Sequence, residues 1–408
     1  MTDVDTLATA DVVVVGAGIA GLCTAWELKR RGFDVVVVEQ RFPAFGATGR
    51  NPGSLWLQTR RTGLELDLAR AGRAKYGEFL EELGDVFEFR THGGLFFFES
   101  DAQGLVLEKY VEDRQKAGLD IQMVSREEAR DHTPLLPETA IGAVYCAEDA
   151  QIDSQQFISA LGAACRRRGV RHFDNTAVLS TLREGDNVVG VRTVRGEVRA
   201  SGVVWATGAW ATNLRAEGFD LPIRTARGGQ LITQPIDTAP SAILHGPRGV
   251  HSCGALLDLP AFNPALFAAA GSDSTGENAA VALLSYDDSI ALNRGGSLDI
   301  GTSIDAEGSL NPHISLVATH AMVETSLERY PQLSHYGVTG LWAGLMSDTA
   351  DHLPIVDRVD GAYVTAGHLW GVASGPICGQ IMADLIAGEP HQLGRGLRFD
   401  RPSLQPAG

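Results

Sequence analysis

Val12-Val13-Val14-Val15-Gly16-Ala17-Gly18-Ile19-Ala20-Gly21, near the start of the chain, decides the fold. An apolar run of strand length leads directly into G-x-G-x-x-G, and apolar residues at helical spacing continue to Gly32. A second apolar run, Val35 to Val38, ends in Glu39, about 20 residues after the glycine turn. This order predicts a strand–helix–strand unit of the Rossmann type.

Each glycine of the turn has a physical reason. Gly16 permits the tight turn, Gly18 lets the backbone approach a pyrophosphate, and Gly21 lets helix and strand pack closely. The N–H groups at the helix start favour a diphosphate, and Glu39 can accept hydrogen bonds from a ribose. The alternative is a glycine-rich surface turn, and the motif by itself does not separate FAD from NAD.

Composition bounds the classes of function. The chain has 408 residues and a net charge of −16, which suits two domains and argues against nucleic acid or an anionic membrane as the main partner. The five cysteines form no C-x-x-C pair, so we expect no metal site, no disulfide framework and a cytoplasmic location. We predict no secretory signal in the first residues. The sequence has no run of about 18 apolar residues, so we expect no membrane span.

Three further segments bear on the organisation of the chain. Residues 46–54 are rich in Gly, Pro and small polar residues, which predicts a loop along a ligand rather than a plain connection. Residues 262–280 are rich in Ala, Gly and Ser, and we interpret them as an exposed insertion: a lid, a docking segment or, more simply, disorder. Ser374-Gly375-Pro376 predicts a helix start with proline at its first turn.

Six motifs together resemble the D-amino-acid oxidase superfamily of FAD-dependent amine oxidoreductases, over nearly the whole length. The chain is most similar to the branch with glycine oxidase, the sarcosine oxidase β-subunit and related dehydrogenases. The motifs are Val14-Val15-Gly16-Ala17-Gly18-Ile19-Ala20-Gly21, Gly46-Ala47-Thr48-Gly49-Arg50-Asn51, Val204-Trp205-Ala206-Thr207-Gly208-Ala209-Trp210, Gly340-Leu341-Trp342-Ala343-Gly344-Leu345, Asp351-His352-Leu353-Pro354-Ile355 and Gly367-His368.

The resemblance implies FAD and a mixed α/β and α+β fold, in which a Rossmann-type domain is interleaved with a β-sheet substrate domain. The expected FAD-binding domain comprises residues 1–86, 149–222 and 331–408, and the substrate domain comprises 87–148 and 223–330. The cofactor-binding residues it implies are Gly16, Ala17, Gly18, Ile19, Ala20, Gly21, Glu39, Gln40, Arg41, Thr48, Gly49, Arg50, Asn51, Gly53, Ser54, Leu55, Val178, Ala206, Thr207, Gly208, Trp210, Gly344, Gly371, Val372, Ala373 and Ser374. The positive end of the last helix would face the flavin N1/C2=O edge; simple docking of that helix on the sheet is the alternative.

The implied reaction is the oxidation of an amine or amino acid to an imine, which water then hydrolyses. Glycine and D-amino-acid oxidases have an arginine for the substrate carboxylate where this chain has Met346. The anchor therefore moves or the substrate differs, and Arg50, Arg227, Arg294 and Tyr286 are the candidates. The run after Met346 is more similar to the sarcosine oxidase β-subunit branch, which favours secondary amines: N-alkyl amino acids, cyclic amino acids or opines.

Two other departures concern the acceptor and the flavin linkage. The only lysines are Lys29, Lys75, Lys109 and Lys116, whereas sarcosine oxidases use a later lysine to assist oxygen. Either an arginine or histidine replaces it, or the enzyme is a dehydrogenase, which we favour. Residues 347–352 contain no cysteine, so we predict non-covalent FAD.

Three residues are candidates for a place near the flavin ring. They are His352, His368 and Trp370, each with an alternative structural role. The alternative function is a flavoprotein subunit of a multisubunit dehydrogenase, which would pass electrons to a partner; the partners would then be a second subunit or further copies of this chain. An FAD monooxygenase is a third possibility, but no second G-x-G-x-x-G supplies an NAD(P)H site.

Overall fold

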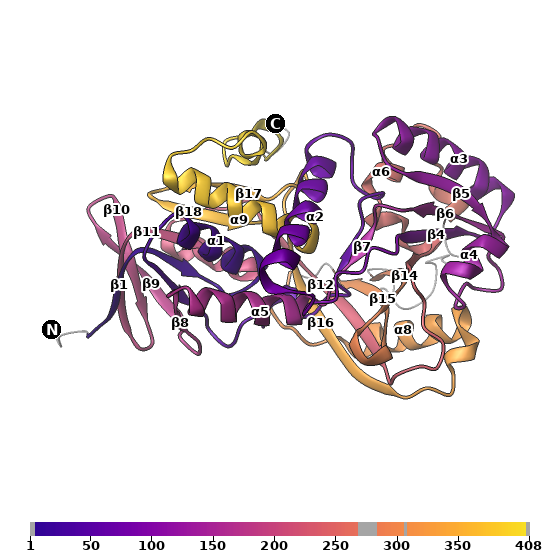
Figure 1. The fold of residues 1–408 in the computed structure, drawn as a ribbon, viewed down its shortest axis with the longest axis horizontal. Coiled ribbons are helices and arrows are strands. Elements are labelled where there is room, and N and C mark those ends of the chain that lie inside the picture. The colour runs from indigo at the N-terminus through magenta and orange to yellow at the C-terminus, as the bar shows by residue number, and fades with distance from the viewer. Residues whose placement is uncertain (1–4, 268–283, 306–307, 405–408) are drawn as a thin grey trace.

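The computed structural model describes residues 5–267, 284–305 and 308–404. Two eight-stranded sheets form two lobes, joined side by side (Figure 1). Helix α2 (Leu64–Leu83) lies where the lobes meet, and the short strands β3 (Ser54–Leu55) and β7 (Ala150–Gln151) pair with each other. This architecture confirms the predicted fold class.

The first sheet has the order β17-β18-β11-β1-β2-β8, and the β9–β10 hairpin extends from β11. Its strands are β1 (Thr6–Val15), β2 (Val35–Val38), β8 (Arg171–Phe173), β9 (Val178–Glu184), β10 (Asn187–Thr193), β11 (Gly196–Trp205), β17 (Ile355–Val359) and β18 (Ala362–Ala366). Strands β1, β2, β8, β11 and β18 run parallel, so their carboxyl ends meet at one edge. Ligands bind at that edge in sheets of this kind.

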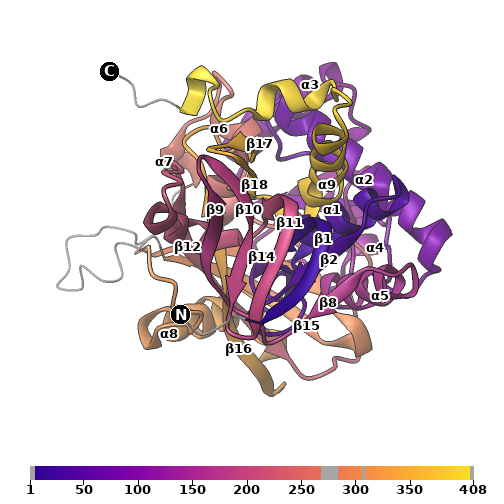
Figure 2. The same cartoon turned by 90° about the vertical axis from the view of Figure 1, so that its left-hand side faces the viewer.

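Helices cover one face of this sheet. They are α1 (Ile19–Arg30), α5 (Ser154–Arg167) and α9 (Gly371–Ala387), and α1 packs against both α5 and α9. Val12 and Val14 of β1 enter this helical core, whereas Val13 and Val15 point to the opposite face. There the β9–β10 hairpin and the 3-10 segment η2 (Gly208–Glu217) cover the sheet, as Figure 2 shows for the hairpin. The predicted strand–helix–strand unit is confirmed.

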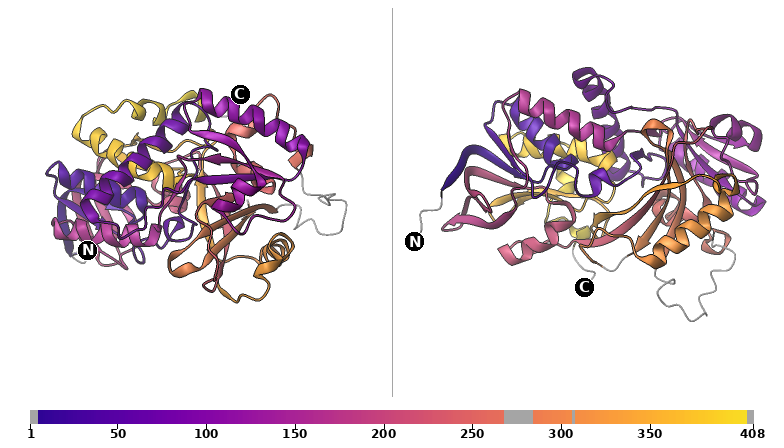
Figure 3. Two further views of the ribbon diagram at one scale, coloured as in Figure 1. Left: turned by 45° about the vertical axis from the view of Figure 1, so that its right-hand side comes forward. Right: turned by 90° about the horizontal axis from the view of Figure 1, so that it is seen from below.

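The second sheet has the order β16-β12-β15-β14-β13-β4-β6-β5. Its strands are β4 (Gly94–Phe98), β5 (Ile121–Ser125), β6 (Gly142–Cys146), β12 (Arg224–Thr233), β13 (Ile243–His245), β14 (Leu284–Leu292), β15 (Leu298–Asp305) and β16 (Val338–Asp348). Its helices are α3 (Asp101–Lys116), α4 (Arg126–His132), α6 (Gly254–Leu257), α7 (Pro264–Phe267) and α8 (Leu316–Arg329). Figure 3 shows the orange helix α8 lying against these strands, where Met322 packs with Leu231 and Ile300.

The chain crosses between the lobes more than once, but one predicted boundary differs from the observed strand pairing. Strand β16 pairs with β12, so residues 338–348 belong to the second sheet. The predicted boundary at 331 instead placed them with the first sheet. The proposed insertion 262–280 lies mostly outside the described residues. Within its described part, Phe267 is buried and its ring contacts Phe262.

The last helix begins earlier than its sequence predicts. Helix α9 starts at Gly371, and Pro376 lies inside it rather than at its first turn. A proline has no N–H, so the carbonyl of Val372 loses its usual helical donor. The buried Tyr76 hydroxyl of α2 donates to that carbonyl at 2.7 Å. The interior proline is therefore tolerated because a neighbouring helix replaces the missing hydrogen bond.

Helix α2 holds this first turn by close packing as well. A Cβ on Gly72 would lie 1.7 Å from the carbonyl oxygen of Ala373, so the helices can approach only with glycine there. Within the described residues, no helix has the length and apolar character needed to cross a membrane. The same residues contain no group of three or more His, Cys, Asp or Glu able to hold a metal ion.

Tyr76→Phe is expected to destabilise the protein by about 1–3 kcal/mol, because it leaves the buried Val372 carbonyl unpaired. The measurement is the free energy of unfolding in urea, with Tyr363→Phe, outside the α2–α9 contact, as the matched control. Equal stability of Tyr76→Phe and the parent would contradict this account of Pro376.

Candidate active site

A cavity of about 850 Å³ lies where the two sheets meet. Its lining comes from the β1–α1 turn, residues 45–60, strands β12, β15 and β16, and the first turn of α9. The carboxyl ends of the parallel strands β1 and β11 open into it. This size and placement are typical of a cofactor and substrate site.

The β1–α1 turn brings three backbone segments into contact. Gly16 has φ +110°, and a Cβ there would lie 2.3 Å from the carbonyl oxygen of Ala206. A Cβ on Gly21 would lie 2.0 Å from the oxygen of Gly16, so neither position admits a larger residue. Helix α1 starts after its N-cap Gly18, at the cavity wall. The first N–H groups of a helix have no partner within the helix and suit a diphosphate.

Glu39 follows β2 and lies in the cavity wall, largely buried. Its Oε2 accepts from the N–H of Ala17 and its Oε1 from that of Arg41, both at 2.9 Å. Burial raises the pKa of this carboxyl, and the backbone donors oppose the rise. The remaining lone pairs of the two oxygens can accept from ribose hydroxyls. Gln40 lines the cavity as well.

The predicted loop 46–54 is fixed by its own polar contacts. Thr48 Oγ1 accepts from the N–H of Ile19 at 3.1 Å, which joins the loop to the start of α1. Asn51 Nδ2 donates to the carbonyl oxygens of Ala47 and Thr48, at 2.9 and 2.7 Å. Its Oδ1 accepts from the N–H of Gly53 at 2.7 Å. Asn51 therefore organises the loop while it also lines the cavity.

Most of the predicted cofactor residues lie around this one cavity, and their individual roles stay predictions. The residues that line it are Gly16, Gly18, Ile19, Ala20, Glu39, Gln40, Thr48, Arg50, Asn51, Ser54, Val178, Ala206, Thr207, Gly208, Trp210, Gly344, Gly371, Val372 and Ala373. Those that do not line it are Ala17, Gly21, Arg41, Gly49, Gly53, Leu55 and Ser374. Ser374 Oγ instead donates to the carbonyl of Trp370 at 3.2 Å, within the first turn of α9.

Unpaired polar atoms in the wall indicate that a polar ligand belongs there. Thr207 Oγ1, His368 Nδ1 and Trp370 Nε1 are buried, and each is without a partner among the described residues. Buried polar groups normally have partners, so these atoms suit a ligand with donors and acceptors along its length. Together with the glycine turn and Glu39, they fit FAD.

His352 lies outside the cavity lining. Its Nδ1 is 3.0 Å from both carboxylate oxygens of Asp348, which does line the cavity. Asp348 also accepts from Arg224 at 3.3 Å. His352 has φ +61°, a left-handed conformation that is uncommon for a non-glycine residue. Its place in the structure is that of a residue that orients Asp348 rather than one that meets a bound molecule.

His368 and Trp370 line the cavity, and their place near the flavin ring stays a prediction. His368 Nε2 and the Thr365 hydroxyl are 2.8 Å apart, and burial lowers the pKa of His368 to about 4. The imidazole is therefore neutral at physiological pH and does not supply a cation. Trp370 is the N-cap residue of α9 and stacks against an arginine that the sequence analysis did not select.

The structure places the five substrate candidates differently. Arg50 lines the cavity, but its Nη1 donates to the carbonyls of Pro312 and Ala343, at 3.1 and 3.2 Å. Arg294 lies outside the lining, and its exposed side chain is 3.8 Å from Glu88. Met346 lines the cavity.

The remaining candidates are Tyr286 and Arg227. The side chain of Tyr286 is outside the described part of the structure. Arg227, the further candidate, is buried and does not line the cavity.

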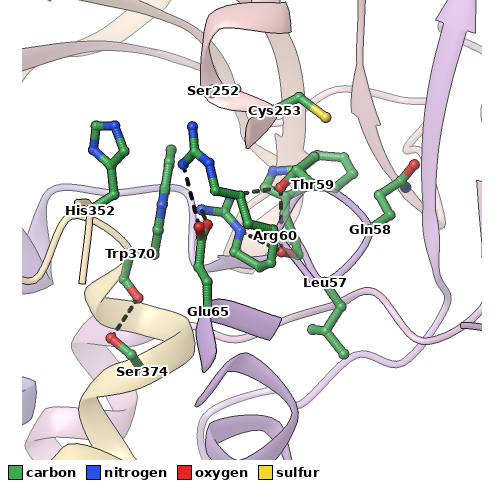
Figure 4. A network of polar contacts seen from close by, with 12 residues as sticks. Leu57, Gln58, Thr59, Arg60, Glu65, Ser252, Cys253, His352, Trp370 and Ser374 are labelled. Carbon is green, nitrogen blue, oxygen red and sulfur yellow. Dashed lines mark hydrogen bonds and ion pairs between the residues drawn. The ribbon is translucent and has the colours of Figure 1, made fainter. Parts of the chain in front are cut away.

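Arg60 is the residue that sequence reasoning missed. It is only 2% exposed and lines the cavity, and its guanidinium carbon lies 3.6 Å from the ring centre of Trp370. Its Nε donates to the carbonyl of Trp56 at 2.9 Å and its Nη2 to Thr59 Oγ1 at 2.6 Å. Glu65 Oε1 is 3.5 Å from Nη1 (Figure 4). Burial lowers the pKa of Arg60, which an arginine sustains without losing its charge.

The segment that carries Arg60 is anchored by a buried carboxylate. Asp149 accepts from the N–H groups of Leu57 and Gln58, at 2.7 and 3.1 Å, and from Gln58 Nε2 at 2.6 Å. A Cβ on Gly94 would lie 2.5 Å from Asp149 Oδ2 and 2.6 Å from the Trp56 ring. Trp56 lines the cavity next to Arg60. Burial raises the pKa of Asp149 to about 6.

Other missed lining residues come from the second sheet, among them Gln230 of β12 and Thr302 of β15. The neighbouring arginines Arg60 and Arg61 look like surface charge in the sequence, and only Arg61 is partly exposed. The one available signal was their distance of a few residues from the glycine-rich loop. Gln230 gave no signal, since a single polar residue between Gly229 and Leu231 of a strand has no motif around it.

Comparison with known proteins identifies the family. The model of the DAO family of FAD-dependent oxidoreductases matches residues 11–385. The chain belongs to this family. The match confirms the predicted choice of FAD over NAD, because FAD is the cofactor that gives the family its description.

Two curated relatives share 28% and 26% sequence identity with this chain. The chain is 28% identical to the bifunctional protein ThiO/ThiG of Nostoc sp. over 93% of its own length and 53% of that protein. It is 26% identical to glycine oxidase of Pseudomonas aeruginosa, over 92% of this chain and 94% of the relative. The chain spans about half the length, or less, of the first curated relatives it matches.

A solved structure with the same fold is glycine oxidase from Geobacillus kaustophilus. Its TM-score is 0.80 at 21% identity, over 98% of this chain and 99% of that one. At this identity the likeness establishes the fold alone. The residues of the substrate end of the cavity therefore have to be interpreted from their own contacts.

Glu39→Ala is expected to raise the FAD dissociation constant about 10- to 100-fold, because a charged acceptor is lost at the cavity wall. Glu39→Gln should give a smaller increase, since one amide oxygen can still accept from Ala17. The measurement is fluorescence titration of the apoprotein with FAD, with Glu184→Ala, an exposed residue of β9, as control. An unchanged dissociation constant in Glu39→Ala would exclude a ribose contact.

Asp149→Asn is expected to flatten the pH dependence of stability. The folded pKa of about 6 exceeds the ordinary value of about 3.9, so between these values the native protein holds a proton that the unfolded chain releases. Stability from this group is complete below about pH 4 and is lost as the pH rises through 6. Thermal unfolding between about pH 4 and pH 7 measures it. Asp186→Asn, in the exposed β9–β10 turn, should keep the parent's pH dependence.

Proposed function

We propose that this protein oxidises an amino acid or a secondary amine, such as an N-alkyl amino acid, a cyclic amino acid or an opine, to an imine. When bound, FAD supplies the acceptor for the hydride from the carbon next to the nitrogen, at flavin N5. The imine is then hydrolysed by water. The observation that carries the amino-acid part of the proposal is the buried Arg60 in the cavity wall.

Arg60 is suited to hold a carboxylate. A guanidinium has five N–H donors, and three nitrogens of Arg60 use one each on Trp56, Thr59 and Glu65. At least one donor on each Nη therefore remains for a bound molecule, which is the fork that matches a carboxylate. The Trp370 ring fixes the plane of the fork. Glu65 at 3.5 Å compensates the charge only in part.

This placement accounts for the absence of an arginine at position 346. The anchor would be on the 56–60 segment instead of on β16, where Met346 leaves an apolar wall. The substrate would then lie with its carboxylate at Arg60 and its nitrogen toward the second sheet. Apolar and aromatic walls exclude water, which strengthens the ionic contact.

The FAD is proposed to be non-covalent, since none of the lining residues is a cysteine and the five cysteines are buried free thiols elsewhere. An acceptor other than oxygen is also proposed, because the lining contains no lysine. If electrons instead go to a partner subunit, the activity in a native extract will elute from gel filtration at a different position from the purified chain. That outcome would favour the multisubunit alternative.

The test is anaerobic bleaching of the bound flavin by D-, L-, N-methyl and cyclic amino acids, each paired with its decarboxylated amine. Arg60→Met should weaken binding of the carboxylate-bearing member at least about 30-fold and leave the plain amine nearly unchanged. Arg60→Lys should fall between, because a lysine presents no fork. Arg130→Met, on exposed α4, is the matched control. Bleaching by no member of the panel would overturn the proposed function, and equal effects on both members would exclude Arg60 as the anchor.

A further inference from the structure

Gln230 occupies a position on β12 that neither the glycine turn nor the Arg60 segment explains. Its side chain is 3% exposed, yet it lines the cavity. On the same face of β12, Gly228 lies against Thr302 and Met346, both of which line the cavity too. Gln230 therefore projects from the second sheet toward the space that the substrate would occupy.

The orientation of the Gln230 amide is set by its neighbour. The Thr302 hydroxyl has one hydrogen, which it donates to the carbonyl of Gly301 at 2.7 Å. It can therefore only accept from Gln230 Nε2, which lies 2.9 Å away. The amide nitrogen is committed to Thr302, and the amide oxygen remains on the other side. Gln230 Oε1 is buried and has no partner among the described residues.

This oxygen differs in kind from the other unpaired atoms of the wall. Within the described lining, the buried atoms without a partner are Trp205 Nε1, Thr207 Oγ1, Gln230 Oε1, His368 Nδ1 and Trp370 Nε1. The indole nitrogens only donate, and the hydroxyl and imidazole can donate. Gln230 Oε1 is the member of this set that can only accept. A bound molecule must bring an N–H or O–H donor to satisfy it.

We propose that Gln230 Oε1 accepts a hydrogen bond from an N–H of the substrate amine and so selects substrates that keep an N–H on their nitrogen. This inference rests on the proposed function and adds the feature that separates primary and secondary amines from tertiary ones. The amide oxygen does not remove this proton, so it accepts the hydrogen bond and leaves the proton on the substrate nitrogen. As hydride leaves the adjacent carbon, positive charge grows on the nitrogen and the N–H becomes a stronger donor.

The hydrogen bond therefore strengthens toward the transition state, which places its effect on the rate as well as on binding. Gln230 touches the substrate in this proposal and acts as a specificity-determining residue. Thr302 does not touch the substrate nitrogen and acts as a positioning residue, because it holds the amide in one orientation.

The experiment compares an N-methyl amino acid with its N,N-dimethyl counterpart on the FAD-loaded protein. The dissociation constants come from the change in flavin absorption on binding, and the reduction rates from anaerobic stopped flow. The parent should prefer the N-methyl compound at least about 10-fold, since the dimethyl compound leaves the buried acceptor unpaired when its nitrogen is neutral. Gln230→Leu should lose that preference through a weaker response to the N-methyl compound alone.

Two further variants separate the hydrogen bond from general packing. Gln230→Glu retains an acceptor and should retain the preference, whereas Thr302→Val frees the amide to rotate and should reduce the preference without abolishing binding. Gln122→Leu, on the exposed face of β5, should match the parent. An unaltered flavin spectrum in each variant shows that the cofactor site is intact.

The outcomes distinguish the two levels of the proposal. A parent flavin that no amine bleaches overturns the proposed function itself. Bleaching with the same preference in Gln230→Leu as in the parent overturns the role of Gln230 alone, and so does an equal loss for both compounds. Loss of preference in Gln230→Leu with its retention in Gln230→Glu supports the hydrogen bond to the substrate nitrogen.

Discussion

The contact between α2 and the first turn of α9 is the constraint on which the site depends. Gly72 lets the backbones meet at Ala373, and Tyr76 donates to the carbonyl that Pro376 leaves without a helical donor. In the first turn of the same helix, Glu65 forms an ion pair with Arg60. Arg60 in turn stacks on Trp370, the N-cap residue of α9. One long helix thus places both the start of α9 and the arginine of the cavity.

The electrostatic character of the cavity follows from which charges are already committed. The Arg50 guanidinium donates to backbone carbonyls. Asp348 is paired with Arg224 and His352. Arg60 is the buried cation of the lining that is only partly compensated, and burial strengthens its attraction for an anion. Around it stand neutral groups, including His368, whose lowered pKa keeps it uncharged. The lining therefore combines the buried positive charge of Arg60 with neutral side chains that include Trp370 and His368.

Sequence reasoning succeeded where local physics sets the outcome and failed where distant segments meet. The glycine turn, Glu39 and the flanking strands follow from steric and periodic patterns within a few dozen residues. The start of α9 was placed wrongly because proline usually begins a helix, and the compensating Tyr76 is remote in the sequence. β16 was assigned to the wrong lobe because strand length predicts a strand but not its pairing partner. His352 belongs to a quoted motif, yet its ring points to Asp348.

The sequence by itself determined the family and the cofactor, through six motifs that together resemble the D-amino-acid oxidase superfamily, and it predicted the strand–turn–helix unit that forms one wall of the cavity. The turn of that unit depends on close backbone approach, which glycine permits, and its strands and helix follow from the order of short apolar runs. Only the tertiary structure decided which cation and which acceptor face the remaining space. Arg60 and Gln230 look ordinary in the chain, and they acquire their roles because Asp149, Trp370 and Thr302 orient them from other elements. The direction in which a side chain points is a property of its packed neighbours, so residue type and spacing do not contain it.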